Sequence, residues 1–265
     1  MTIPSPPPPL KRLGQHFLTD PNMVRKILAE AAIRPDETVY EIGPGRGVLT
    51  HPLCGVASQV IAVELDKKLA DYLSKTCFHS NLDLRTGDAL EFDYHALPQG
   101  TVVVANLPYY VSTPLLFQLL EQRSRISRMV LMLQLEVAKR LAAKPGGRDY
   151  GALSVLSQYC AKSRLAFKIP ASCFRPRPDV DSAVVTLSVI PTESDAFHRD
   201  FIQIVRAAFA HRRKTLGNSF RERGWPTTTI QDALGKVHID PKRRAETMTV
   251  QEFIDLTHAI RFYFL

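Results

Sequence analysis

Short apolar segments of strand length alternate with amphipathic segments of helix length from residue 38 to residue 189. The strand-length segments are rich in branched residues, and Thr101–Ala105 (TVVVA) is apolar on both faces. Strands of this kind are typical of a parallel sheet that helices cover on each side. The pattern therefore predicts a doubly wound α/β domain. The other predicted strands are Thr38–Ile42, Gln59–Glu64, Leu82–Thr86, Met129–Gln134 and Ala183–Val189, and the predicted helices between them cover residues 47–54, 66–76, 114–123, 136–143 and 152–161.

Two flanking segments differ from this pattern. Residues 1–12 (MTIPSPPPPLKR) are proline-rich, and we expect a flexible tail there, followed by a helix that begins at Asp20-Pro21. Residues 190–196 (IPTESDA) predict a linker, after which only helical periodicity remains. We therefore expect an α/β domain over residues 13–190 and a small all-helical domain over residues 191–265. The predicted helices of the second domain are 198–210, 212–223, 227–235 and 249–260.

The chain is basic, with 34 Lys and Arg against 26 Asp and Glu and a formal net charge of +8. A solvated surface of mixed charge would explain this excess, but phosphate binding draws on the same residues, so a nucleic-acid partner is favoured. Between Arg206 and Arg223 the basic residues are interrupted by a single acid, Glu222. We expect this segment to bind RNA through Arg206, Arg212, Arg213, Lys214 and Arg221.

The four cysteines, Cys54, Cys77, Cys160 and Cys173, include no C-x-x-C pair. This spacing argues against a zinc site or a disulfide framework and for free thiols in a reducing compartment. No apolar run approaches the roughly 20 residues of a membrane span, and the first residues lack the apolar core of a secretory signal. We therefore expect a cytoplasmic protein, and membrane and disulfide-scaffold classes are excluded.

A glycine-rich turn, Gly43-Pro44-Gly45-Arg46-Gly47, directly follows the first predicted strand. Such a turn lets the main chain approach a ligand where a Cβ atom would collide, although three glycines are often only a turn. The next strand ends in Glu64 about 20 residues later, where an acid can accept hydrogen bonds from both ribose hydroxyls. Asp88 follows the third strand and, taken alone, is more often a simple turn residue. Together these positions predict a nucleotide pocket.

The later glycine of the dinucleotide-binding pattern is absent, and Val48 stands near its place. The turn can then border an amino-acid group, and Glu41 before it adds negative potential toward a cationic ligand. The segment EIGPGRGVLT resembles the first motif of class I S-adenosylmethionine-dependent methyltransferases, which have a Rossmann-like doubly wound sheet. The resemblance implies Gly43 and Gly45 at the cofactor, Glu64 on its ribose and Asp88 on its adenine amine.

The fourth predicted strand runs into Asn106-Leu107-Pro108-Tyr109, which spacing alone would explain as a strand-end turn. The chemistry of these residues also suggests a catalytic role. An aromatic amine is a poor nucleophile, and two neutral acceptors, the Asn106 amide oxygen and a nearby main-chain carbonyl, can hold its hydrogens and favour a pyramidal nitrogen. A neutral amide also avoids pairing with a cationic sulfonium, and Tyr109 offers a flat face for an unstacked base. These four residues form the candidate catalytic set.

The segment NLPY resembles the motif of enzymes that methylate amino nitrogens, in the form typical of rRNA adenine dimethyltransferases. Further blocks match along the chain, and from about residue 10 it is identified as a member of the KsgA/RsmA-type 16S rRNA adenine N6-dimethyltransferases. The family implies dimethylation of two adjacent adenosines in the 3′-terminal hairpin loop of 16S rRNA within the small subunit or its precursor, by a monomer that needs no metal. It also implies His16, Leu18 and Asn106 bordering the cofactor and Phe174 as a second stacking face. The matching blocks are LGQHFL, NLPYYVSTP, GALSVLSQY, FRPRPDVDSAV, RKTL and RAET.

Two positions depart from the family pattern. His16 replaces the usual Asn, so its contact can run through an imidazole nitrogen, and Tyr110 also stands where many members have Asn. Three alternatives remain: an Erm-type 23S rRNA methyltransferase, a DNA adenine methyltransferase, and a binding-only relative of the organellar transcription factors. The matching blocks outside the NLPY motif favour a 16S rRNA methyltransferase over the 23S rRNA and DNA enzymes. Retention of Gly43, Glu64, Asp88 and Asn106–Tyr109 counts against the binding-only alternative.

Overall fold

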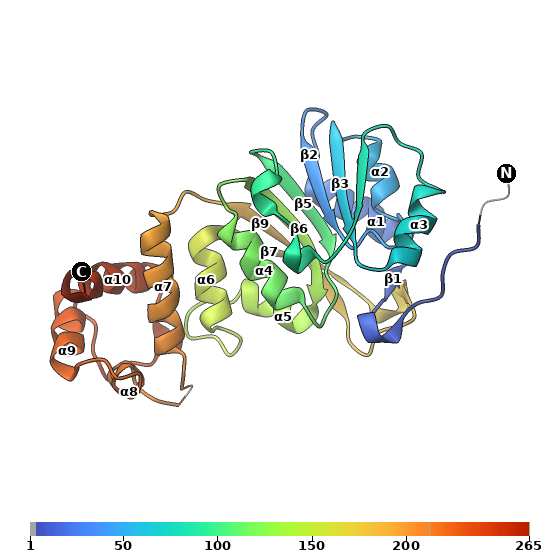
Figure 1. Cartoon of the computed structure of the whole chain (residues 1–265). Helices are drawn as coiled ribbons and strands as arrows, with labels where there is room; N and C mark the ends of the chain where they lie inside the picture. The colour runs from blue at the N-terminus through green and yellow to red at the C-terminus, as the bar shows by residue number, and fades with distance from the viewer. Residues whose placement is uncertain (1–3, 212, 265) are drawn as a thin grey trace. The chain divides into compact units, whose positions relative to one another are not determined.

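The structure, a computed structural model, describes residues 4–211 and 213–264 and divides the chain into two compact units (Figure 1). The first unit combines residues 1–138 with 162–189, and the second combines 139–161 with 190–265. The expected boundary at residue 190 therefore misplaces residues 139–161. The reason is packing, because Tyr159 of α6 (Ala152–Cys160) stacks on Phe201 of α7 (Asp195–Ala208) with ring centroids 4.1 Å apart.

The first unit contains a seven-stranded sheet in the order β4-β3-β2-β5-β6-β9-β7. The five strands from β4 to β6 are parallel, and β9 is antiparallel to β6. The predicted doubly wound fold is confirmed, and Met129–Gln134 is the second part of a longer strand. The strands are β2 (Thr38–Ile42), β3 (Gln59–Glu64), β4 (Leu82–Thr86), β5 (Thr101–Asn106), β6 (Ile126–Gln134), β7 (Ala161–Ile169) and β9 (Ser182–Val189).

The edge strand β7 is absent from the sequence-based prediction, which left this stretch without a strand. Its signal is visible, since Lys162, Arg164 and Lys168 alternate with apolar residues in the two-residue period of a half-buried strand. The burial of the strand follows that alternation only partly, with its two ends buried and its centre intermediate or exposed. An edge strand is covered less than a central strand, which explains why charged residues are tolerated there.

Successive strand residues point to opposite sides of the sheet, so these apolar strands present two apolar faces. Helices cover both faces. Val102 and Val104 of β5 pack with Ile27 of α1 (Pro21–Ala31) and Leu53 of α2 (Thr50–Cys54) in one buried cluster. Val103 is equally buried on the other side. As predicted, α1 begins at Asp20-Pro21, with the Asp20 side chain accepting from the Asn22 amide. The remaining helices of the sheet region are α3 (Lys67–Ser74), α4 (Ser112–Glu121) and α5 (Leu135–Leu141).

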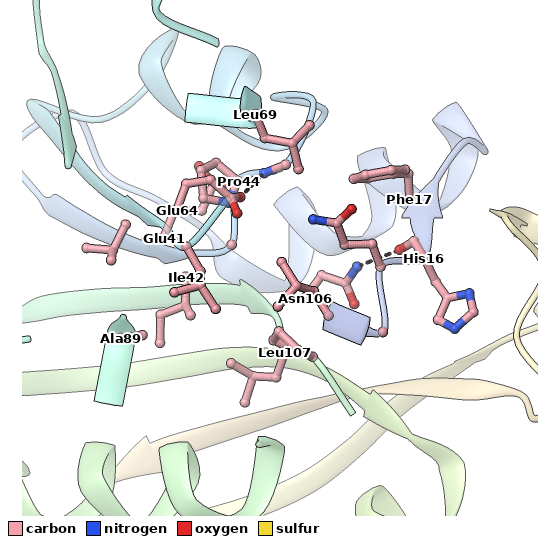
Figure 2. A pocket seen from close by; sticks show the side chains of 18 of the residues that line it. His16, Phe17, Glu41, Ile42, Pro44, Glu64, Leu69, Ala89, Asn106 and Leu107 are labelled. Carbon is pink, nitrogen blue, oxygen red and sulfur yellow. Dashed lines mark hydrogen bonds between the residues drawn. The ribbon is translucent and has the colours of Figure 1, made fainter. Parts of the chain in front are cut away.

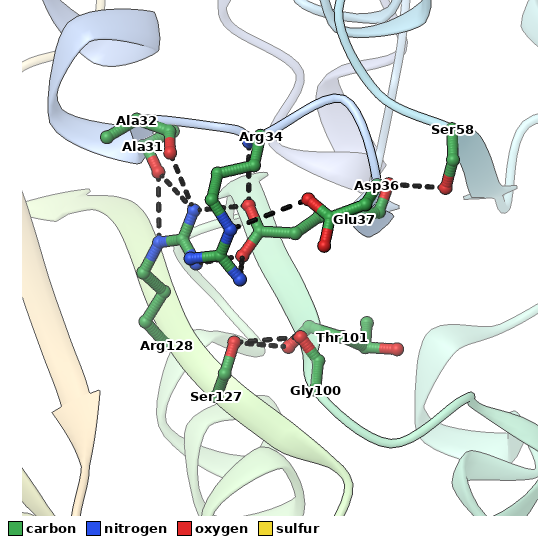
Figure 3. A network of polar contacts seen from close by, with 10 residues as sticks. All are labelled: Ala31, Ala32, Arg34, Asp36, Glu37, Ser58, Gly100, Thr101, Ser127 and Arg128. Carbon is green, nitrogen blue, oxygen red and sulfur yellow. Dashed lines mark hydrogen bonds and ion pairs between the residues drawn. The ribbon is translucent and has the colours of Figure 1, made fainter.

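Arg128 at the start of β6 ties this sheet to the end of α1 (Figure 3). Its guanidinium donates to the carbonyl oxygens of Ala31 and Ala32, which have no partner within the helix, and to both carboxylate oxygens of Glu37. The hydrogen bonds from Arg128 lower the pKa of Glu37, which is 5% exposed, to about 2. Both oxygens of the buried Glu37 carboxylate accept hydrogen bonds, which offsets the cost of burying its charge.

The N-terminal segment is attached to the first unit from Pro7 onward. The Arg46 guanidinium donates to the Pro7 carbonyl oxygen at 2.9 Å, and the Leu10 amide donates to the Gln15 side chain at 2.7 Å. A 3-10 helix spans Lys11–Leu13, and the short strand β1 (Phe17–Leu18) pairs antiparallel with β8 (Phe174–Arg175). The second half of the expected flexible tail thus contacts the first unit through these hydrogen bonds.

The second unit is helical, as the sequence predicts, apart from a short 3-10 helix at Ala245–Thr247. Besides α6 and α7 it contains α8 (Leu216–Glu222), α9 (Thr227–Lys236) and α10 (Val250–Phe264). Phe209 and Phe253 contribute to its core, with ring centroids 5.8 Å apart. Among the described residues, no helix is long and apolar enough to cross a membrane.

Candidate active site

A single pocket in the first unit collects the residues that follow the parallel strands (Figure 2). Its walls are the carboxyl ends of β2, β3, β4 and β5 together with the N-terminal segment from Leu13 to Thr19. Ligands of open α/β sheets bind outside the carboxyl ends of the strands. The predicted nucleotide and base pockets are therefore two parts of one cavity.

The glycine turn after β2 forms the floor of the pocket. Gly43 and Gly45 adopt φ angles of +67° and +59°, which side chains other than glycine rarely tolerate. The amide of Gly43 donates to the Val63 carbonyl oxygen at 2.9 Å, so the turn is fastened to the neighbouring strand β3. A Cβ atom on Gly45 would lie 3.2 Å from the Phe17 ring, so the N-terminal segment also closes over the turn.

Glu64, at the end of β3, is 6% exposed and faces the glycine turn. One carboxylate oxygen accepts from the Gly45 amide at 2.9 Å and the other from the Asp66 amide at 2.9 Å. Burial raises the pKa of Glu64, and these two main-chain donors partly oppose the rise. Each carboxylate oxygen can accept more than one hydrogen bond. Glu64 is thus held in place with acceptor capacity left for the hydroxyls of a ligand.

Glu41, the last but one residue of β2, also lines the pocket and is only 2% exposed. Its Oε2 atom has no hydrogen-bond partner among the described residues. Burial, with a smaller effect from the nearby negative charge of Glu64, raises the pKa of Glu41 to about 8. A buried carboxylate oxygen without a partner is costly, and a cationic ligand group would supply the missing partner.

Asp88 and two apolar residues form the remaining edge of the nucleotide side. One Asp88 oxygen accepts from the Leu90 amide at 2.9 Å and caps a 3-10 helix, and the side chain stays half-exposed at the pocket. Leu65 and Ala89, which follow the two acids directly, also line the pocket, and Leu65 is 41% exposed. Sequence reasoning missed both residues, although their places after Glu64 and Asp88 are a usable signal. They offer apolar contact to a flat ring.

Asn106 ends β5 at the junction of the two parts of the pocket. Its side-chain nitrogen donates to the His16 carbonyl oxygen at 3.2 Å, a hydrogen bond drawn in Figure 2. This bond assigns the amide orientation and leaves the Asn106 side-chain oxygen as a free acceptor, since the described residues supply no donor to it. The Leu107 amide donates to the Met132 carbonyl oxygen at 3.1 Å, which fixes the turn that follows.

Tyr109 completes this part of the pocket. Its hydroxyl shares a 2.6 Å hydrogen bond with the buried Ser182 side chain, and its ring stacks on the His16 imidazole at a centroid distance of 5.6 Å and an interplanar angle of 27°. Burial raises the pKa of Tyr109, so its hydroxyl is neutral at physiological pH. The Tyr109 ring is therefore held by the hydrogen bond at its hydroxyl and by stacking on His16.

His16 lines the pocket, as expected, and its imidazole is engaged by neighbouring residues. The imidazole Nδ1 lies 2.8 Å from the Pro176 carbonyl oxygen, to which it donates, and the ring packs on Tyr109. The main-chain carbonyl of His16, by contrast, contacts Asn106. Leu18 lines the pocket as expected and is otherwise buried in the core. The imidazole of His16 therefore supports the part of the pocket that Tyr109 forms.

The expectation that Phe174 forms a second stacking face is wrong for this structure. Its side chain is fully buried, with 0% exposure, in the cluster that also contains Leu18 and Ile169. Its backbone is fixed by the pairing of β1 with β8, where Phe174 lies opposite Leu18. A base would reach the ring only if the ring left the hydrophobic core. Phe174 therefore contributes packing behind the pocket.

Tyr110 is a pocket residue to which sequence reasoning gave no role. It is 54% exposed, lines the pocket and lies against Gly14, where a Cβ atom would be 3.7 Å from its ring. Burial of part of its side chain and the negative charge of Asp88 raise its pKa. An aromatic ring at the pocket mouth is suited to contact a nucleotide base.

The basic residues expected to bind RNA lie in the second unit, at the end of α7, in the following loop and in α8. Arg206, Arg213, Lys214 and Arg221 are all exposed, and Arg212 lies outside the described residues. Lys214 forms an ion pair with Glu222, which His211 also contacts at 2.8 Å, and the Lys214 hydrogen bond lowers the pKa of Glu222. Part of the positive charge of this segment is thus already balanced.

The doubly wound sheet and the pocket at its carboxyl edge define a class I methyltransferase fold. The chain is similar, with a TM-score of 0.80 and 28% identity, to a dimethyladenosine transferase from Plasmodium falciparum, over 91% of this chain and 96% of that one. For the 23S rRNA methyltransferase ErmE the TM-score is 0.72 and the identity 25%, over 92% and 99% of the two chains.

Sequence comparison identifies the family within that class. The chain belongs to the ribosomal RNA adenine dimethylase family, whose family model matches residues 10–261. It is 43% identical to the ribosomal RNA small subunit methyltransferase A of Moorella thermoacetica, over 96% of this chain and 93% of that protein. The identity to the protein of the same name from Aromatoleum aromaticum is 42%, over 94% and 93%.

Proposed function

We propose that this protein transfers methyl groups from S-adenosylmethionine to the N6 amines of two adjacent adenosines in the 3′-terminal hairpin loop of 16S rRNA during assembly of the small ribosomal subunit. The observation that carries the proposal is the Asn106 amide, whose nitrogen is held by the His16 carbonyl so that its oxygen remains a neutral acceptor beside Tyr109. Family membership and relatives that carry the name small subunit methyltransferase A support the same substrate.

The residues of the nucleotide side fit the proposed cofactor. The unpartnered oxygen of Glu41 suits a cationic amino group, and the left-handed turn at Gly43 and Gly45 leaves room where a side chain would intrude. Glu64 would accept from ribose hydroxyls, and Asp88 from an adenine amine. When bound, S-adenosylmethionine supplies an electrophilic methyl group on a sulfonium. Asn106 is neutral, so it would not form an ion pair with that sulfonium.

Two neutral acceptors at Asn106 and Leu107 would orient the adenine amine. The Asn106 oxygen and the Leu107 carbonyl oxygen accept no hydrogen bond from the described residues, so both are available to the two amine hydrogens. Accepting both hydrogens favours a pyramidal nitrogen and directs its lone pair away from the ring, and the proton released after transfer passes to solvent. A monomethylated amine retains one hydrogen, for which one acceptor is sufficient. The same pair therefore accommodates the second methylation.

The basic segment around α8 would contribute RNA affinity outside the pocket. Exposed Arg206, Arg213 and Arg221 suit phosphate contacts, whereas the pocket suits a base that has left its stack. Bases of a hairpin loop are easier to splay out than bases of an A-form helix. A cytoplasmic location and a monomeric state belong to the same proposal, since the substrate is a ribosomal precursor.

A 23S rRNA methyltransferase is the second candidate, because ErmE shares the fold over most of the chain. The experiment that separates the candidates measures transfer of labelled methyl groups to small-subunit particles, to 23S rRNA and to duplex DNA. We expect transfer to the small-subunit particles alone. Transfer to 23S rRNA or DNA with none to the particles would contradict the proposal, and S-adenosylmethionine binding without transfer to any substrate would support the binding-only alternative.

A further inference from the structure

Two histidines and a cysteine meet on the surface of the first unit, outside the methyltransferase pocket. His51 belongs to α2, and Cys77 and His79 lie in the loop between α3 and β4. One potential ligand atom from each side chain lies within 4.8 Å of the others. The two imidazoles contact each other edge to face, with ring centroids 5.7 Å apart. None of these three residues is used in the proposed methyl transfer.

The donor set is that of a zinc site. Zn²⁺ binds imidazole nitrogen and thiolate sulfur in tetrahedral geometry, with bonds of about 2.0–2.3 Å. Such bonds place neighbouring ligand atoms roughly 3.3–3.6 Å apart, so the three side chains need to close by about 1 Å. The imidazoles reach solvent, whereas Cys77 is 5% exposed, so the approach would be made by the two imidazoles. The described hydrogen bonds and ion pairs of His51 and His79 include none made by their side chains.

The cluster adjoins the cofactor turn through His51. The His51 amide donates to the Gly47 carbonyl oxygen at 3.1 Å, and a Cβ atom on Gly47 would lie 3.2 Å from the His51 ring. A metal that holds His51 would therefore restrain the last residue of the glycine turn. On the inner side, the thiol of Cys77 contacts that of Cys54, which is also buried. The cluster thus has a dry face and a solvent face.

We propose that His51, Cys77 and His79 form a binding site for Zn²⁺, with water as the fourth ligand. Two imidazole nitrogens and one thiolate, from a helix and a loop that are anchored to the sheet, would hold the ion. The proton displaced from Cys77 leaves to solvent when the sulfur binds the metal. The sequence-based expectation of no zinc site rested on the absence of a C-x-x-C pair, and the spacing Cys77-x-His79 with a distant histidine lies outside that pattern.

Metal binding to the full-length chain, without an affinity tag, tests the proposal. The protein is stripped with a chelator and titrated with Zn²⁺ in competition with a chromophoric chelator. We expect one Zn²⁺ per chain with a dissociation constant below about 1 µM, and a rise in melting temperature when Zn²⁺ is added. Absence of stoichiometric binding in this titration would overturn the proposal.

Single-residue variants test which side chains bind the ion. His79→Ala should weaken Zn²⁺ binding at least tenfold and abolish the rise in melting temperature. The matched control His95→Ala, at an exposed histidine outside the cluster, should bind as the parent does. Unchanged Zn²⁺ affinity in His79→Ala, or an equal loss in both variants, would contradict the site.

Cobalt provides a readout that a structural effect would not mimic. Co²⁺ in place of Zn²⁺ should give a thiolate-to-metal charge-transfer band, and Cys77→Ser should remove that band while Cys173→Ser retains it. Each variant is first shown to have a cooperative melting transition. A charge-transfer band that persists in folded Cys77→Ser would exclude Cys77 as a ligand and overturn the assignment.

Discussion

The side-chain nitrogen of Asn106 donates to the main-chain carbonyl oxygen of His16, 90 residues earlier in the chain, at 3.2 Å. The neighbouring strand β1 is held by β8 through the pairs of Phe17 with Arg175 and of Leu18 with Phe174. The N-terminal segment thus determines which way the Asn106 amide is turned. An acceptor for an adenine amine is thereby oriented before any ligand binds, and pre-organised polar groups of this kind lower barriers.

Asn106→Ala should reduce the single-turnover methylation rate by roughly 10²–10³-fold, because one of the two acceptors for the amine is lost. The affinity for S-adenosylmethionine should stay within about threefold of the parent, since Asn106 holds the base in our account. Rapid-quench measurement of labelled methyl transfer gives the rate, and calorimetry gives the affinity. A variant rate within a few fold of the parent rate would remove Asn106 from the base pocket.

Glu64→Gln should weaken S-adenosylmethionine binding by roughly 10–100-fold, which corresponds to about 1.5–3 kcal/mol for charge-assisted hydrogen bonds. The carboxylate also accepts from the amides of Gly45 and Asp66, and an amide side chain can serve only one of these donors well. Calorimetric titration measures the change, and Glu91→Gln, at another acid near the sheet edge, serves as the control. Equal affinities for parent and Glu64→Gln would show that this acid does not bind the cofactor.

Cofactor binding at pH 7 should release up to about one proton through Glu41. Burial raises the pKa of Glu41 to about 8, so the free protein carries a neutral carboxyl there below that pH. A bound ammonium group favours the ionised form, so affinity should rise as pH increases toward 8. The folding stability of the free protein should depend on pH in the opposite direction. The stability that the protonated Glu41 carboxyl contributes is fully present below about 4.5, its ordinary pKa, and is lost as pH rises through 8.

Calorimetry in two buffers with different ionisation enthalpies measures that proton release directly. The variant Glu41→Gln, which stays neutral, should release fewer protons and show a flatter dependence of affinity on pH. Equal proton release in the parent and the variant would place the titrating group elsewhere in the pocket.

Reversing the charges of Arg213 and Arg221 should weaken binding to small-subunit particles, and the loss should shrink as salt increases. Lys214→Glu should have a smaller effect, because Lys214 is already paired with Glu222. Cofactor affinity should not change, since the pocket is formed by residues of the first unit alone. Filter binding across a salt series provides the measurement, with Lys236→Glu as the matched charge reversal. A loss that is the same at every salt concentration would argue against phosphate contacts.

The sequence predicted most of the sheet and the nucleotide side of the pocket, because both depend on local patterns. The glycine turn at Gly43 and the acid at Glu64 stand at fixed positions relative to predicted strands, and parallel strands bring their carboxyl ends to one edge. The edge strand β7 was missed because its first residue, Ala161, was assigned to the predicted helix over residues 152–161, and the alternation of charged and apolar residues after it was not used.

The role of His16 and the burial of Phe174 could not be obtained from local patterns. Both depend on the pairing of β1 with β8, which joins segments more than 150 residues apart, as the contact between Thr19 and Cys173 also shows. Long-range pairing is not encoded in periodicity, and a resemblance supplies the residue but not its surroundings. The cluster of His51, Cys77 and His79 likewise appears only when a helix and a distant loop are brought together.

Mass spectrometry of 16S rRNA from small-subunit particles that lack these modifications, after reaction with the protein and S-adenosylmethionine, tests the central claim most directly. We expect two adjacent adenosines in the 3′-terminal hairpin loop to carry two methyl groups each on N6, and the same adenosines to stay unmodified in the parallel reaction with Asn106→Ala. Methyl groups found only on a 23S rRNA fragment, or none on that 16S loop, would contradict it.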